Sequence, residues 1–254
     1  MIGSNIHYFY YPLEYCFRKM AELGYTKMEL YLGTPHVFVD GIIKESFADI
    51  RRLEMTYGIR IIAVHPETIS FRYNLCSPDK DWRKRSLEAY LNAIDFAESY
   101  GIGRLNTEIN GVFRDIPRGE TEKRVWESLS QIIHYGNERG VVVALETERR
   151  SFQGLLSTVG EFAHMTEQLP EPPAITLNCD AAAEAGETVD DWFERFGEGI
   201  SMIRFGDSSC FRELRPLVEA NGYCGDYIFY PTDDKYWDEP VEADRMLIGG
   251  AGWV

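Results

Sequence analysis

The residues best suited to chemistry are two acids that each close an apolar run. Glu146 lies at the end of VVVALE, and Asp180 lies at the end of ITLNCD. Carboxylates can hold a divalent metal ion or remove a proton as bases. Two later runs carry Arg204, in SMIRFGD, and Tyr230, in DYIFYP. The chain therefore offers two carboxylates that suit a metal ion or a base, with a basic and an aromatic side chain near the ends of later runs.

Such residues need a scaffold that brings distant strand ends together. Apolar, often β-branched runs alternate with segments of helical period, and no Pro/Ser-rich linker interrupts them. Gly24, Gly58, Gly101 and Gly140 each stand between a helical segment and the next run, where a helix of this fold class ends. The expected strands are 2–9, 26–31, 59–65, 103–109, 141–147, 174–180, 200–206 and 226–231.

This pattern predicts an α/β fold, the (β/α)8 TIM barrel, because eight strands followed by helices are what that barrel requires. About 250 residues commonly form one such barrel, so we expect residues 1–254 to be a single domain. Only 24 residues follow Tyr230, and they end in LIGGAGWV. The last helix is therefore expected to be short or missing.

In a closed barrel, the carboxyl ends of all strands open into one mouth. Other candidates for this mouth are Glu29, His65, Glu108, Glu148 and Asp207, and His36 lies in the loop GTPHVF. Glu146 and Glu148 share one face of a strand, because strand side chains alternate. Burying several carboxylates without a cation is costly.

Charge and composition exclude several classes of partner. The formal net charge is −15, from 41 acids and 26 bases, which would repel phosphate backbones and anionic lipid. We expect neither nucleic acid nor a membrane as partner, since no run approaches the roughly 20 apolar residues of a membrane helix. The N-terminus lacks the pattern of a signal peptide. Five scattered cysteines without a CxxC pair favour a cytoplasmic location.

Three stretches carry a family resemblance: YPLEYCFRKMAELGYTKMELYLGTPHVF, then HPETISFRYN, then WRKRSLEAYLNAIDFA. They resemble the xylose isomerase-like family of sugar isomerases and epimerases, and the similarity covers roughly residues 5–231. Members are single βα barrels that hold a divalent metal with Glu, Asp, His and Glu from strands five to eight. The resemblance implies that Glu146 is the first ligand and a base, and that Asp180 is the second ligand. It places Arg204 and Tyr230 where the His and the last Glu of the family stand.

The chemistry implied is proton abstraction beside a carbonyl. A C–H bond there becomes acidic enough for a carboxylate base only if the developing enediolate oxygen is stabilised, which a metal can do. A second group on the other face then allows inversion of the carbon. We keep Tyr230 among the catalytic candidates as a hydrogen-bond donor rather than a proton carrier, because an unperturbed phenol titrates near 10. His65, Glu108, Arg204 and His36 are expected to contact the sugar.

Arg204 leaves two hypotheses about the cofactor. An arginine has no lone pair for a metal, and at about 4 Å it would repel a dication by several kcal/mol at an effective dielectric near 20. In the first hypothesis the guanidinium replaces the metal and bridges Glu146 and Asp180. In the second, a manganese, cobalt, magnesium or zinc ion is retained by Glu146 and Asp180, with Asp207 and waters as further ligands.

Three functions follow from these hypotheses. The first is a sugar epimerase or a close isomerase relative, acting on a ketose or fructosamine at carbon 3 with Glu146 as base. The second is a catalytically silent barrel that binds a sugar or acts as a scaffold. The third is the barrel subunit of a complex that cleaves C-glycosides. Beyond the sugar, a homo-oligomer is the partner that we keep for the first function, whereas the scaffold would hold a partner subunit and the third function would need a small β-rich partner.

Overall fold

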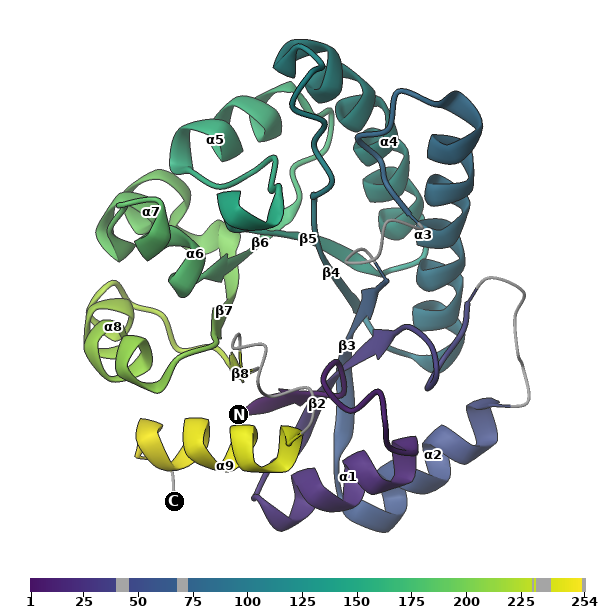
Figure 1. Ribbon diagram of the computed structural model, residues 1–254, viewed down its shortest axis with the longest axis vertical. Coiled ribbons are helices and arrows are strands. Elements are labelled where there is room, and N and C mark those ends of the chain that lie inside the picture. The colour runs from purple at the N-terminus through teal and green to yellow at the C-terminus, as the bar shows by residue number, and fades with distance from the viewer. Residues whose placement is uncertain (40–45, 68–72, 230, 232–238, 253–254) are drawn as a thin grey trace.

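The computed structural model describes residues 1–39, 46–67, 73–229, 231 and 239–252. Its strands close into a parallel barrel in sequence order, with β1 hydrogen-bonded to both β2 and β8 (Figure 1). The TIM barrel predicted from the sequence is confirmed. Its strands are β1 (Ile2–Ser4), β2 (Lys27–Leu32), β3 (Arg60–Pro66), β4 (Arg104–Glu108), β5 (Val142–Glu146), β6 (Ala174–Asn178), β7 (Ile200–Phe205) and β8 (Tyr227–Phe229).

Helices form the outer ring of the barrel (Figure 1). None in the described part of the chain is long and apolar enough to cross a membrane. The α-helices are α1 (Leu13–Glu22), α2 (Ser46–Tyr57), α3 (Lys80–Tyr100), α4 (Arg118–Glu138), α5 (Val159–Gln168), α6 (Cys179–Glu184), α7 (Val189–Phe196), α8 (Ser208–Ala220) and α9 (Pro240–Ala251). Two 3-10 turns, η1 (Arg150–Phe152) and η2 (Gly197–Gly199), lie between them.

The helix after β8 is present and has 12 residues, as many as α2. Pro240 begins α9, where its fixed φ suits the first turn, and Gly252 ends it in the left-handed conformation with φ 74°. The 24 residues after Tyr230 are thus enough for a helix. Gly249, Gly250 and Gly252 lie within or directly after α9, whose buried face carries Leu247 and Ile248.

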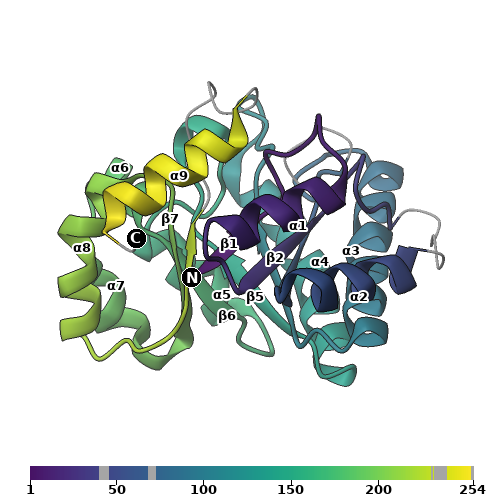
Figure 2. The same ribbon diagram turned by 90° about the horizontal axis from the view of Figure 1, so that it is seen from below.

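A buried hydrogen bond ties α9 to the start of the barrel. The Tyr8 hydroxyl, in the loop between β1 and α1, donates to Asp244 Oδ2 over 2.6 Å. Asp244 is buried, and burial raises the pKa of its carboxyl to about 7. Figure 2 shows α9 running beside the β1–α1 region, so the two ends of the chain close the ring together.

The protein has two interior regions, one between the strands and the helices and one inside the barrel. Side chains on their outer faces, such as Leu105 and Val143, pack against the helices in the main hydrophobic core. Inside the barrel, a small separate apolar cluster consists of Ile2, Met202 and Ile228. Polar and charged side chains fill the remaining lumen, because the inward positions of several strands are not apolar.

Candidate active site

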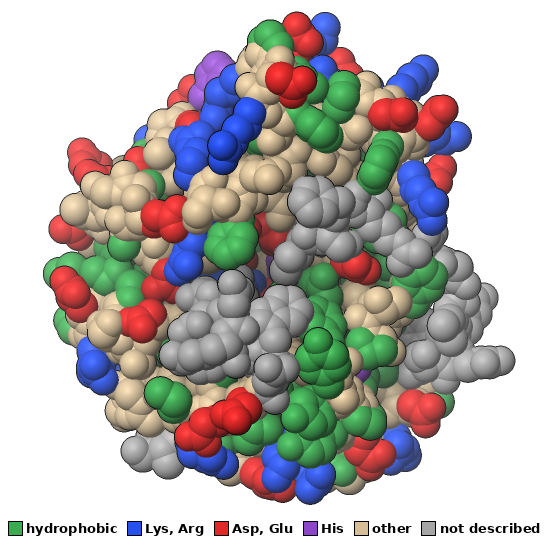
Figure 3. All heavy atoms as spheres, in the orientation of Figure 1, with side chains coloured by type: hydrophobic (Ala, Val, Ile, Leu, Met, Phe, Trp, Pro, Cys, Tyr) green, Lys and Arg blue, Asp and Glu red, His purple; other side chains and the backbone are tan. Residues whose placement is uncertain are grey.

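Arg204 lies in the barrel lumen between two carboxylates from strands that are not its neighbours. Its Nη2 donates to Glu29 Oε2 over 2.8 Å and to Oε1 over 3.1 Å, and its Nε lies 2.6 Å from Glu146 Oε1. Only 2% of Arg204 is exposed. The guanidinium of Arg204 thus extends from β7 across the lumen toward β2 and β5. Seen along the barrel axis, charged side chains are visible in the hollow centre (Figure 3).

Glu146, the last residue of β5, has two unequal oxygens. Oε1 faces Arg204 and accepts a hydrogen bond from the Asn178 amide over 3.2 Å. Oε2 is buried and accepts no hydrogen bond from any residue that the structure describes. Burial raises the pKa of Glu146 to about 7, while Arg204 opposes this rise. Glu146 is therefore a carboxyl group held on one side and poised to gain or lose a proton near neutral pH.

Glu29, in the middle of β2, is held by a chain of hydrogen bonds that begins at the N-terminal end of β4, which we call the floor of the barrel. Asn106 Nδ2 donates to Glu29 Oε1 over 2.5 Å, and Arg104 Nε donates to Asn106 Oδ1 over 2.6 Å. Burial alone would raise the pKa of Glu29. The charges of Arg204 and His65, with hydrogen bonds from Asn106 and Arg204, outweigh burial and hold that pKa below its ordinary value. Glu29 is thus an anion at neutral pH.

His65 and Glu108 form a second buried pair, from β3 and β4. His65 Nε2 lies 2.6 Å from Glu108 Oε2, and Nδ1 lies 3.0 Å from the Pro66 carbonyl oxygen. Burial would lower the pKa of His65, but Glu108 and then Glu29 raise it, against Arg204, to about 9. Both ring nitrogens then donate, so His65 is an imidazolium that bonds Glu108 and the backbone.

The raised pKa of His65 predicts a loss of stability at high pH. Folding raises this pKa from 6.5 to about 9, so the stabilisation is fully present below pH 6.5 and is lost as pH rises through 9. We expect the free energy of unfolding in urea to fall by up to about 3 kcal/mol from this group between pH 6 and 10. His65→Gln should lack this component, whereas His164→Gln, at an exposed site on α5, should keep it. Equal pH slopes for wild type and His65→Gln would contradict the assignment.

The structure corrects the expected position of Asp180. β6 ends at Asn178, whose side chain caps α6 by accepting from the Ala181 backbone N–H. Asp180 therefore lies in the first helical turn, where it accepts from the Gly206 backbone N–H and lies 3.8 Å from Arg149 Nη2. Arg204 has the expected contact with Glu146, but its second carboxylate is Glu29, not Asp180.

Asp207, the other proposed metal ligand, is the exposed N-cap of α8. Its carboxylate accepts from the backbone N–H groups of Ser209 and Cys210. A hydrogen bond from the Ser209 hydroxyl and these backbone bonds lower its pKa. Its oxygens are thus used to begin a helix.

These residues do not fit a divalent metal ion. No group of three or more His, Cys, Asp and Glu side chains among the described residues is arranged to bind one. A guanidinium holds the place between Glu29 and Glu146 where a cation would sit, and a dication beside it would be repelled. We therefore derive no chemical step through a metal.

His36 and Tyr230 are the two remaining candidates from the sequence. His36 joins two loops: Nδ1 lies 3.0 Å from Asn5 Nδ2, and Nε2 lies 2.8 Å from the Tyr11 carbonyl oxygen. Burial lowers its pKa, so the neutral ring accepts from Asn5 and donates to Tyr11. A sugar contact of His36 stays a prediction, and Tyr230 lies outside the described residues.

The lumen also contains polar residues that were not singled out from the sequence. Arg104 and Asn106 lie four and two positions before Glu108 on β4, and Arg104 also donates to the hydroxyls of Ser201 and Thr176. Asn178 was missed as the amide donor to Glu146. Polar residues at alternate positions in RLNTE are the signal that could have found the first two, because alternate side chains share one face of a strand.

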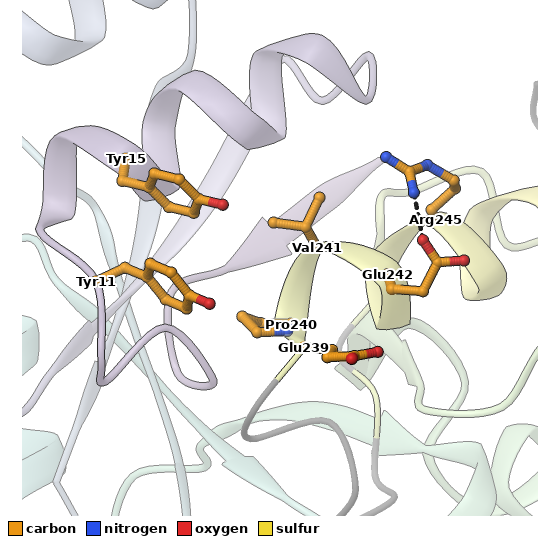
Figure 4. Close-up of a pocket in the computed structure, with 7 residues that line it drawn as sticks. All are labelled: Tyr11, Tyr15, Glu239, Pro240, Val241, Glu242 and Arg245. Carbon is orange, nitrogen blue, oxygen red and sulfur yellow. Dashed lines mark hydrogen bonds and ion pairs between the residues drawn. The ribbon is translucent and has the colours of Figure 1, made fainter.

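A separate pocket of about 410 Å³ lies at the rim, between the start of α1 and the start of α9. The rings of Tyr11 and Tyr15 stack there at 4.5 Å, facing Pro240 and Val241 (Figure 4). Its other lining residues are Glu239, Glu242 and Arg245. None of the buried charged residues described above lines this pocket.

Comparison with known proteins gives one family and several relatives. The model of the xylose isomerase-like TIM barrel family matches residues 17–221. Fructoselysine 3-epimerases from Shigella flexneri and Escherichia coli O157:H7 are each 26% identical to this chain over 252 residues. The match covers 93% of this chain and 91% of each relative.

Solved structures agree in fold over the whole chain. D-psicose 3-epimerase from Clostridium cellulolyticum H10 superposes with a TM-score of 0.79 at 16% identity, covering 99% of this chain and 97% of that one. The apo form of 3-keto-D-glucoside 4-epimerase from E. coli has the same TM-score at 13% identity, covering 100% and 99%. At these identities the structures establish the architecture.

Proposed function

Because this chain belongs to the xylose isomerase-like TIM barrel family, we propose that it is a sugar epimerase that removes a proton beside the carbonyl of a ketose or fructosamine. Its curated relatives are named as fructoselysine 3-epimerases, and structures of similar fold include a D-psicose 3-epimerase. Carbon 3 of a ketose is therefore the position that we propose for proton exchange.

The observation that carries this proposal is the state of Glu146. A general base works best when its pKa lies near the working pH, and burial raises the pKa of this carboxyl to about 7. Arg204 and Asn178 hold Oε1, which leaves Oε2 as the oxygen that takes the proton. Glu146 is the last residue of β5, so its side chain lies at the mouth of the barrel.

Arg204 supplies positive charge next to this base. Removal of a proton beside a carbonyl leaves negative charge on the carbonyl oxygen, and a fixed buried cation stabilises such charge strongly. The guanidinium is already oriented by Glu29 and Glu146, so little reorganisation is needed during the reaction. Tyr230 is the residue that we propose as a hydrogen-bond donor on the opposite side of the sugar, where a water molecule would return a proton to carbon 3 and so complete the inversion.

The test is exchange of substrate hydrogen with solvent. Purified protein is incubated in D2O with a panel of ketoses and fructosamines, and NMR follows the signal at carbon 3. We expect deuterium to enter at that carbon of at least one sugar, and the same rate in Glu127→Gln, which changes an exposed carboxylate on α4. Absence of exchange across the panel in folded protein would overturn the proposal and favour a barrel that binds a sugar without turnover.

A further inference from the structure

We propose that Arg204 is the resident cation of this site, that Glu29 is the residue which positions it, and that the site therefore takes no divalent metal. Metal-independent proton removal rests on the proposed function, but metal binding can be measured without turnover. The proposal starts from where the guanidinium lies. It bridges Glu29 on β2 and Glu146 on β5, with only a few per cent of any of these three side chains exposed.

The charges inside the barrel already balance. The buried carboxylates of Glu29, Glu108 and Glu146 lie among three cations. His65 bonds Glu108, Arg204 bonds the two other carboxylates, and Arg104 reaches Glu29 through Asn106. His65 and Arg104 are protonated at neutral pH, because their pKa values are about 9 and about 10. Even with every one of these carboxylates ionised, these described side chains together carry no excess negative charge that would attract a dication.

The nearest additional acids are held by groups of the protein. Glu148 follows Glu146 by two residues, and its Oε1 accepts a hydrogen bond from the Arg149 backbone N–H over 2.6 Å. Asp180 has the Arg149 guanidinium 3.8 Å away, and Gly206 donates its backbone N–H to the same carboxylate. Asp207 is the helix cap described above.

Glu29 holds Arg204 in this position through bonds that start at the floor of the barrel. Arg104 orients the Asn106 amide, Asn106 donates to Glu29 Oε1, and both oxygens of Glu29 accept from Arg204 Nη2. A carboxylate fixed in this way accepts a guanidinium in one orientation. Without Glu29, the Arg204 side chain would keep Glu146 as its only partner among these carboxylates.

Manganese provides the direct test of metal binding. Wild-type protein, as purified and after dialysis against a chelator, is analysed for Mn, Co, Zn and Mg, and Mn²⁺ binding is measured by electron paramagnetic resonance. We expect far less than one equivalent of bound metal and no tight Mn²⁺ site. Near-stoichiometric metal that is lost in Glu146→Gln would overturn the proposal, whether or not the protein turns over a sugar.

Variants separate the cation from the carboxylates around it. Arg204→Met leaves buried negative charge, so its affinity for Mn²⁺ should rise at least tenfold over wild type. Arg204→Lys keeps the charge and should stay free of metal. The double variant Glu29→Gln, Arg204→Met should not show this rise in Mn²⁺ affinity. Equal Mn²⁺ affinity of wild type and Arg204→Met would contradict the proposal, and if Arg204→Met does not fold, the wild-type titration decides alone.

A spectroscopic measurement tests the positioning role of Glu29. The guanidinium of Arg204 should rotate slowly about its Cζ–Nε bond and give separate NMR signals for its terminal nitrogens, assigned by their loss in Arg204→Lys. Glu29→Gln should speed this rotation at least tenfold, Glu29→Asp should restore part of the restriction, and Glu127→Gln should leave it unchanged. Unaltered rotation in Glu29→Gln would show that Glu29 does not position Arg204.

Discussion

Glu146→Gln is expected to lower the rate of deuterium entry at carbon 3 by about 10²- to 10⁴-fold, the usual contribution of a positioned general base. The amide has nearly the same shape as the carboxylate, and its oxygen can still lie against the Arg204 guanidinium and accept from Asn178. It cannot take a proton from carbon. We therefore expect kcat to fall while KM changes little, as measured by NMR at several ketose concentrations.

The control for this prediction is Glu127→Gln, which makes the same chemical change on the exposed face of α4. Circular dichroism and urea unfolding of both variants check that the fold is kept. A loss in Glu146→Gln smaller than about tenfold would be too little for a general base and would contradict the assignment.

Arg204→Met should destabilise the protein by about 3–5 kcal/mol, because removing one partner of a buried ion pair leaves uncompensated charge. Here two carboxylates, Glu29 and Glu146, lose their shared cation. Without the cation the pKa values of both carboxyl groups rise, so the cost should shrink as pH falls and both groups become protonated. Urea unfolding at pH 5 and pH 8 measures the loss and its pH dependence.

The double variant Glu29→Gln, Arg204→Met distinguishes lost charge balance from lost packing. Removing one negative charge together with the cation should recover part of the stability at pH 8. Arg245→Met, at a surface pair with Glu242 on α9, should cost no more than about 1 kcal/mol. If Arg204→Met also lowered the free energy of unfolding by no more than about 1 kcal/mol, charge would not be what stabilises the buried network.

The fold was predictable because its signals are local. The four glycines expected to end helices, Gly24, Gly58, Gly101 and Gly140, all have positive φ values, between 66° and 86°. Only glycine adopts this conformation without strain, so each marks the end of a helix before a strand. The short β1 was not predictable in its length, since the apolar and aromatic residues after Ser4 form a loop whose Tyr8 packs in the core.

The site was only partly predictable. The contact between Arg204 and Glu146 follows from both lying at strand ends of one barrel. The choice of Glu29 over Asp180 depends on where β6 stops, and Asn178 decides this by capping α6 with its oxygen while its amide nitrogen donates to Glu146. An Asn before CDAAAE is a helix start signal, so the sequence did contain the information.

The balance of charge could not be read from the sequence in the same way. Arg104, Asn106 and Glu108 alternate along β4 and so share one face, but this pattern does not say which residues of the other strands they bond. His65 and Glu108 lie 43 residues apart, and only barrel closure brings them within 2.6 Å. The pKa of each group depends on such neighbours, and so does the protonation state that determines its chemistry.

Deuterium exchange by protein depleted of metal is the most direct test of the central claim, that a buried carboxylate removes the proton and a buried arginine stabilises the negative charge that results. The protein is dialysed against a chelator, its metal content is measured, and exchange at carbon 3 of a ketose is followed in D2O. We predict that the rate is unchanged by depletion and is lost in Glu146→Gln. Exchange that disappears on depletion and returns on adding Mn²⁺ would contradict the account.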